Sequence, residues 1–276
     1  MGEHMEPIDA RSPKELKRKL RERDVSVPLR GMGQTKEHRE TWAACRLLET
    51  LADSCLLRYP LRVEHTDRPD LIVTLPDSQI GIELVEAIAT DQARFTEKIN
   101  RKYANSESSG IEIIATPRFR QSDPQLTKPE MKALVSRTVS SKALNESPIM
   151  GDAFERDWLE GMIHCIDDKT DKFRKCGFTK KPTNWLQIYD NWRPHPHEHI
   201  VIKMLERELS DSGWKNPFDK VFVLGSRSIW EFGKDCQVVE HEILRSCRSL
   251  DYASSLVADA WLKVGAWLKA SSKAGR

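Results

Sequence analysis

Two acidic residues, Asp70 and Glu83, stand in neighbouring β-rich runs of the sequence. Asp70 precedes the apolar run 71–75, and Glu83 interrupts the run 80–86. Because the residues 76–78 between them, Pro-Asp-Ser, favour a turn, the two runs predict a β-hairpin that holds the two carboxylates close together. Carboxylate oxygens on a rigid sheet are suitable ligands for Mg²⁺, so the pair predicts a metal site.

A third carboxylate can come from the segment before the hairpin. Residues 35–57 have a helical pattern with Thr35 as its cap. Glu37 projects onto the apolar stripe of this helix, and Glu40 lies at the margin of the stripe. A carboxylate on an apolar face needs a partner or a metal ion. The alternative is that both glutamates lie in exposed first turns, where negative charge complements the helix dipole.

The rest of the pattern indicates strands alternating with helices. After the first helix it predicts strands at 61–65, 70–75 and 80–87, a helix at 91–103 and a strand at 111–115. Later helices are predicted at 128–140, 153–172, 198–209 and 256–268, and later strands at 185–189, 221–224 and within 226–232. We therefore expect an α/β fold with a mixed central sheet flanked by helices. The expected division is a basic N-terminal arm (1–34), an α/β core with insertions (35–235) and a C-terminal helical segment (236–276).

The order of helix, three-strand meander, helix and strand between residues 35 and 115 resembles the core of the PD-(D/E)XK nuclease superfamily, which is restriction-endonuclease-like. Pro69 and Asp70 are similar to its Pro-Asp element, and Glu83 is similar to the acidic residue of its (D/E)XK element. The resemblance implies that Asp70, Glu83 and the main-chain carbonyl of Leu84 bind Mg²⁺ or Mn²⁺.

The resemblance also implies roles for residues outside the hairpin. The acidic residue of the first helix is Glu37, with Glu40 as second choice. The superfamily places a lysine two residues after its acidic residue, where this chain has Val85. A basic residue from the next helix can replace this lysine, with Lys98 as first choice and Lys102 as second. The alternative is a mechanism that depends on the metal ion without a lysine.

The activity implied is metal-dependent hydrolysis of phosphodiester bonds in nucleic acid, with DNA preferred. A long helix ending in Lys169, Lys172 and Lys175, followed by the strand at 185–189, resembles an extension found in uncharacterised bacterial nuclease-like proteins. That likeness implies a context of defence or mobile elements. Because the superfamily also contains folds that have lost cleavage, the alternative is a catalytically silent module that binds nucleic acid, a partner protein or, as a homodimer, a second copy of itself.

Net charge gives no direct sign of a nucleic-acid partner. The formal net charge of the 276 residues is +2, so any such binding has to come from local patches. The helix that begins after Ser12 and Pro13 carries a basic run, of which Lys17 and Arg18 are candidate phosphate contacts, together with Lys102. The alternative for this N-terminal segment is a solvated arm.

Other patterns set limits on the class of protein. The 6 cysteines form no C-x-x-C pair, no secretory signal precedes them and no apolar run is long enough for a membrane span, which favours reduced thiols and a cytoplasmic location. No Walker A, dinucleotide-binding or Gly-x-Ser-x-Gly motif is present. The alternating histidines at 195, 197 and 199 are interpreted as part of a surface loop.

Overall fold

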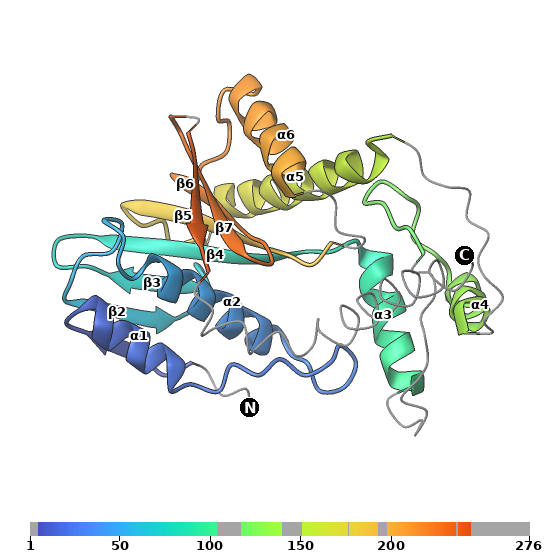
Figure 1. The fold of residues 1–276 in the computed structure, drawn as a ribbon, viewed down its shortest axis with the longest axis horizontal. Helices are drawn as coiled ribbons and strands as arrows, with labels where there is room; N and C mark the ends of the chain where they lie inside the picture. Colours follow the sequence, from blue (N-terminus) through green and yellow to red (C-terminus); the bar gives the residue numbers. More distant parts are fainter. Residues whose placement is uncertain are drawn as a thin grey trace, which may run out of the picture.

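The computed structural model describes residues 5–103, 117–139, 151–175, 177–192, 198–235 and 237–243. Over these residues it contains one sheet of 8 strands and six helices (Figure 1). The strands are β1 (Ile8–Ala10), β2 (Leu61–His65), β3 (Leu71–Thr74), β4 (Gln79–Ala87), β5 (Thr183–Asp190), β6 (Lys220–Leu224), β7 (Ser228–Gly233) and β8 (Val238–Glu242). The helices are α1 (Pro13–Arg21), α2 (Lys36–Leu51), α3 (Thr90–Tyr103), α4 (Lys128–Val139), α5 (Ala153–Arg174) and α6 (Glu198–Asp211).

The sheet is mixed, and its spatial order follows the chain from β1 to β8. Strands β1 to β4 form an antiparallel meander, β4, β5 and β6 are parallel, and β6 to β8 are antiparallel again. Parallel neighbours need a long crossover, and the chain between β4 and β5 supplies one that includes α3, α4 and α5. The prediction of an α/β fold with a mixed sheet flanked by helices is confirmed.

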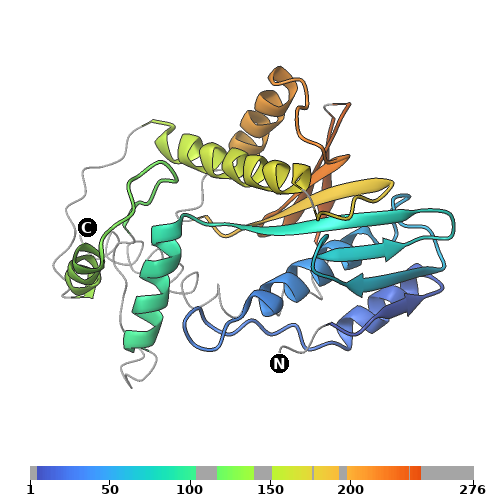
Figure 2. The ribbon, with the colours of Figure 1, turned by 180° about the vertical axis from the view of Figure 1, so that it is seen from behind.

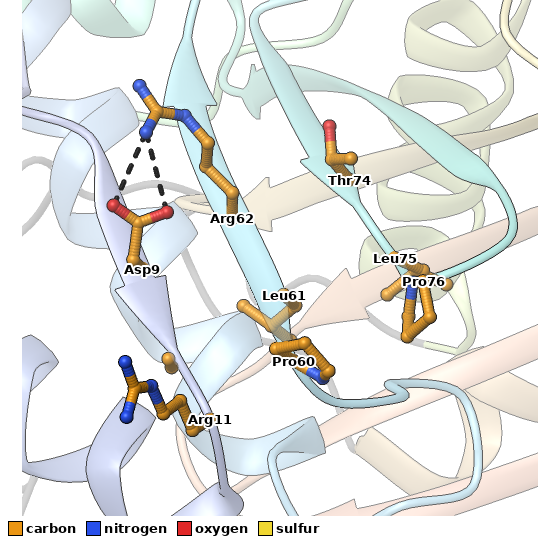
Figure 3. Close-up of a pocket in the computed structure, with 9 residues that line it drawn as sticks. Asp9, Arg11, Pro60, Leu61, Arg62, Thr74, Leu75 and Pro76 are labelled. Carbon is orange, nitrogen blue, oxygen red and sulfur yellow. Dashed lines mark hydrogen bonds and ion pairs between the residues drawn. The ribbon is translucent and has the colours of Figure 1, made fainter.

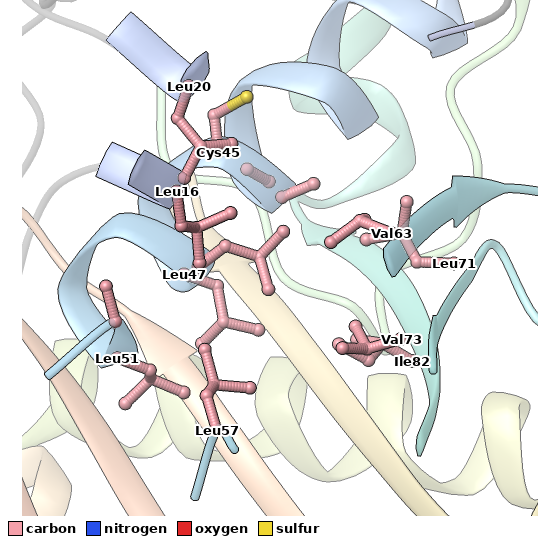
Figure 4. Packing of buried hydrophobic residues seen from close by; sticks show 14 of the residues in the cluster. Leu16, Leu20, Cys45, Leu47, Leu51, Leu57, Val63, Leu71, Val73 and Ile82 are labelled. Atoms are coloured by element: carbon pink, nitrogen blue, oxygen red, sulfur yellow. The ribbon is translucent and has the colours of Figure 1, made fainter. Parts of the chain in front are cut away.

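Helices cover both faces of the sheet. Figures 1 and 2 show α1 and α2 on one face and α5 and α6 on the other, while α3 and α4 lie beyond the end of β4. The core is accordingly divided into two clusters of buried apolar residues. Figure 4 shows part of the first cluster, in which Leu47 of α2 faces Val63, Val73 and Ile82 of the meander. Successive side chains along a strand point to opposite faces of the sheet, so β4 to β7 contribute residues to both clusters, as expected for strands buried on both faces.

The N-terminal segment is part of this fold, and in this respect the expectation of a separate arm is wrong. Strand β1 pairs with β2, with Ile8 opposite Val63. Helix α1 starts as predicted, since the Ser12 side chain accepts a hydrogen bond from the amide of Glu15. Leu16 of α1 is fully buried against the first core cluster because α1 presents an apolar stripe to α2.

Two further expectations need correction. The sequence pattern predicts the last helix and strand of the superfamily-like core at 91–103 and 111–115. The strand that pairs with β4 is β5, so α5 and β5 complete that core after α2 and the meander. The segment expected to be helical after residue 238 begins instead with strand β8, which pairs along β7. Residues 111–115 and the predicted helix at 256–268 lie outside the described residues.

A cluster of charged residues on the last three strands, β6 to β8, should contribute to stability in a pH-dependent way. Glu231 of β7 is paired with Lys220, and its Oε2 atom lies 2.7 Å from Nε2 of His241. Burial raises the pKa of Glu231, but the hydrogen bonds from His241 and Lys220 outweigh it and hold the pKa below 4.5. A carboxyl group with a lowered pKa stabilises the fold above its unfolded pKa, and this contribution is lost as the pH falls through the folded pKa.

We therefore expect Glu231→Gln to lower the free energy of unfolding by about 1–3 kcal/mol at pH 7. The difference from the wild type should shrink as the pH falls through the lowered folded-state pKa of Glu231, because the carboxyl group is then protonated in the wild type as well. Urea unfolding curves at several pH values measure this difference. A deficit that is constant with pH would contradict the assignment of an ionised Glu231.

Candidate active site

Asp70 occupies a fixed position immediately before β3. Its side chain is buried, and its Oδ2 atom accepts a hydrogen bond of 2.7 Å from the backbone N–H of Leu84 in β4. The register of the hairpin, with Leu71 opposite Ile82, places Asp70 next to Glu83 across the two strands. The pairing of β3 with β4 therefore places the two carboxylates close together, as the sequence predicts.

Glu83 forms an ion pair with a lysine that was not among the predicted site residues. The ammonium of Lys169, on α5, lies 2.6 Å from Oε2 of Glu83 and 3.6 Å from Oδ2 of Asp70. All three residues are at most 9% exposed. One cation is therefore shared by two buried carboxylates, an arrangement in which each charge is expensive to bury without the others.

The electrostatics of this group follow from its burial. Burial raises the pKa of Glu83, the positive charge of Lys169 lowers it and the negative charge of Asp70 raises it, and the net direction is upward. Burial lowers the pKa of Lys169, but Asp70 and Glu83 outweigh it and raise the pKa above 10.5. Lys169 is therefore a protonated donor at neutral pH and not a base.

Helix α2 adds a carboxylate and a second lysine at its first turns. Lys36 lies 2.9 Å from Oε1 of Glu40 and 3.3 Å from Oδ1 of Asp70. Glu40 is buried and its Oε2 atom is 3.5 Å from Nε2 of His65, at the end of β2. The acidic residue that α2 links to Asp70 through Lys36 is Glu40, whereas Glu37, the first choice from the sequence, is half-buried.

Other residues nominated around the hairpin lie elsewhere. Lys98 and Lys102 are exposed on α3, and among the described residues neither forms an ion pair with Asp70 or Glu83. Val85 packs against the second core cluster. Lys169 therefore occupies the place that Lys98 was expected to take.

The helical pattern of α5 marks Lys169 in the sequence. In α5, Lys169 lies three residues after Ile166 and four before Phe173, so it stands on the buried stripe of its helix. A lysine on an apolar stripe needs a carboxylate partner, by the same reasoning that singled out Glu37.

The nominated phosphate contacts of α1 are engaged in ion pairs. Lys17 is paired with Asp53, and Arg18 lies 2.6 Å from Glu22. Asp53 follows the C-terminal end of α2, whereas Lys36 is its first residue. A helix of this length spans about 24 Å, so Lys17 is separated from Asp70 by roughly the length of α2.

A surface pocket of about 320 Å³ lies at the opposite end of the meander (Figure 3). It is lined by residues at the end of β1, the start of β2 and the end of β3, including Leu61 and Leu75, whereas Asp70 precedes the start of β3. An ion pair at its rim joins Asp9 and Arg62 at 3.3 Å. The pocket is therefore distinct from the carboxylate group.

The donor set of the site fits a hard divalent cation. Asp70 and Glu83 present carboxylate oxygens, and Mg²⁺ is commonly held by one or two carboxylates completed by water and substrate phosphate. No cluster of three or more histidine, cysteine, aspartate and glutamate side chains arranged to hold a metal ion occurs within the described ranges. Asp70 and Glu83 are the residues that could hold such an ion, and the role of the Leu84 carbonyl stays a prediction.

Comparisons with protein-family models, with curated proteins and with solved structures found no match to this chain. Among the helices that the structure describes, none has the length and apolar character needed to cross a membrane. His195 and His197 lie outside the described residues.

Proposed function

We propose that this protein is a metal-dependent nuclease that hydrolyses phosphodiester bonds, with Asp70, Glu83 and Lys169 as its active site. The observation that carries the proposal is the convergence of two buried carboxylates from adjacent strands on one lysine from α5. The order of α2, the meander, α5 and β5 around that site also supports the likeness to the PD-(D/E)XK superfamily. DNA is the preferred substrate on that likeness.

Each side chain has a distinct part in the proposed reaction. Asp70 and Glu83 would hold Mg²⁺ or Mn²⁺, with Asp70 fixed by the N–H of Leu84. An ion held there would act as a Lewis acid towards water and would stabilise negative charge on the phosphate. Lys169, protonated at neutral pH, donates hydrogen bonds to the attacking water and to the phosphate oxygens that gain charge.

Glu40 and Lys36 form the outer part of the proposed site. Lys36 links Glu40 to Asp70 and is itself 60% exposed, so its ammonium is accessible to a phosphate that approaches the carboxylates. Glu40 orients Lys36 from the buried side. These two residues therefore position the substrate and the metal-binding carboxylate, and Lys169 acts on the reacting atoms.

The same ion pairs favour a second candidate, a catalytically silent module that binds nucleic acid or a partner protein. Lys169 and Lys36 already neutralise Asp70 and Glu83 without any ion from solution. The four charged side chains can therefore stabilise the fold as ion pairs without binding a metal ion.

Cleavage assays separate the two candidates. We expect the wild type to cut plasmid DNA, single-stranded DNA or RNA with Mg²⁺ or Mn²⁺ and not with EDTA. Glu83→Gln should lower the rate by about 10²-fold or more, because a carboxylate that holds the ion is lost.

The matched control is Glu208→Gln, the same chemical change at an exposed position of α6. It should cleave at the wild-type rate. Cleavage that persists in Glu83→Gln would remove the site assignment, and the absence of cleavage for every substrate and metal would leave the silent module.

A further inference from the structure

A run of basic residues follows Lys169 at the end of α5 and in the loop that leads to β5. Residues 168–181 contain six lysines and arginines and two aspartates, which leaves a local net charge of +4, whereas the whole chain carries +2. The basic residues are Lys169, Lys172, Arg174, Lys175, Lys180 and Lys181. This run is therefore a local excess of positive charge, and it begins at Lys169 of the proposed active site.

Most of this charge is not neutralised within the fold. Arg174 donates a hydrogen bond to the backbone carbonyl of Lys215, and Lys180 lies over the ring of Phe173 at 5.2 Å. Over the part of the chain that the structure describes, no carboxylate forms an ion pair with Arg174, Lys175, Lys180 or Lys181.

The basic residues of α1 differ in this respect. Four of them are paired with carboxylates: Lys17 with Asp53, Arg18 with Glu22, Lys19 with Glu15 and Arg21 with Glu49. Paired cations add little to the potential of a surface, whereas grouped cations without acidic partners attract an anion.

Packing places the run directly beside Asp70. The side chains of Lys181 and Pro69 both lie against Gly81, where an added Cβ atom would come within 3.0 Å of each. Gly177 faces the guanidinium of Arg68, 3.8 Å from such a Cβ position. The loop therefore lies along the turn that delivers Asp70.

We propose that Arg174, Lys175, Lys180 and Lys181, here called the basic surface, bind the phosphodiester backbone of a polynucleotide that enters the active site. Along α5, Lys175 lies about 9 Å beyond Lys169, which corresponds to about two or three nucleotides of one strand. Cations that contact phosphates carry no sequence information, so binding by this surface is independent of sequence. The identity of the anion rests on the proposed function.

Binding measured in EDTA tests the basic surface without any cleavage. The variant Arg174→Gln/Lys175→Gln/Lys180→Gln and the wild type are titrated into fluorescent single- and double-stranded DNA and RNA of equal length at several salt concentrations. We expect the variant to bind about tenfold more weakly or worse, with the slope of log K against log salt reduced by about 2–3 for duplex DNA, because three phosphate contacts are lost.

The matched control is Lys14→Gln/Lys132→Gln/Lys203→Gln, which removes the same charge from exposed positions on α1, α4 and α6. It should keep the wild-type slope, and circular dichroism shows whether each variant is folded. Equal losses in both triple variants, or no binding by the wild type to any polynucleotide, would overturn the basic surface. Binding that depends on it in a protein that never cleaves would overturn the nuclease proposal and leave the surface in place.

Discussion

Lys169→Met should abolish cleavage and destabilise the protein at the same time. The loss of the donor that meets the reacting phosphate should reduce the cleavage rate by about 10³-fold. The loss of the cation also leaves Asp70 and Glu83 buried without their shared partner, which should cost about 2–4 kcal/mol of unfolding free energy. Single-turnover cleavage and urea unfolding measure the two effects.

The pH dependence of the Lys169→Met deficit has a defined sign. Without Lys169 the pKa of Glu83 should rise further, since burial and Asp70 both raise it and the lysine is the group that lowers it. A carboxyl with a raised pKa stabilises the fold below its unfolded pKa, and this contribution is lost as the pH rises through the folded pKa. The deficit should therefore grow from acid to neutral pH.

Two further measurements distinguish a metal site from a structural ion pair. Mg²⁺ should raise the melting temperature of Lys169→Met more than that of the wild type, because the variant has two carboxylates without a competing ammonium. Lys203→Met, an exposed lysine of α6, should leave cleavage and stability unchanged. A Lys169→Met variant that retains cleavage would exclude the lysine from the reaction, and one unaffected by Mg²⁺ would favour the structural role.

Gly161→Ala should destabilise the protein although alanine is the better helix former. In a solvated helix this change stabilises by about 1 kcal/mol. Gly161 of α5 lies against Trp192, and an added Cβ atom would come within 2.4 Å of Cζ3 of the indole ring. Trp192 is buried in the second core cluster and has little room to move, so we expect a net loss of about 2–3 kcal/mol in the free energy of unfolding.

The same contact connects stability to the active site. Trp192 follows β5, so its packing on Gly161 sets how closely α5 approaches the sheet, and Lys169 lies about two turns further along α5. Gly161→Ala should therefore also lower the cleavage rate, since a shift of about 1 Å at a catalytic group costs up to about 10²-fold.

Trp192→Phe provides the test of this mechanism. The atoms that clash belong to the six-membered ring of the indole, which phenylalanine does not extend to the same depth. The double variant Gly161→Ala/Trp192→Phe should regain part of the stability lost in Gly161→Ala, with a coupling energy of about 1–2 kcal/mol. Additive losses in the double variant would mean that Trp192 is not the obstacle.

Much of the fold followed from local patterns. The alternating and apolar runs gave the strands of the meander, and the cap residues Ser12 and Thr35 placed the starts of α1 and α2. Strand β1 escaped prediction because three residues have too little pattern to distinguish them from a loop. The position of β5 beside β4 also escaped, since parallel pairing depends on contacts far apart in the chain.

The sequence by itself determined the proximity of Asp70 and Glu83, because a short turn between two β-rich runs leaves the chain little choice of register. Only the tertiary structure decided which cation forms ion pairs with these two carboxylates. Lys169 is 86 residues from Glu83, and its position depends on how α5 crosses the sheet and on the contact of Gly161 with Trp192. Local sequence patterns do not encode such distances, because helix packing is set by side chains that meet only after the sheet has formed.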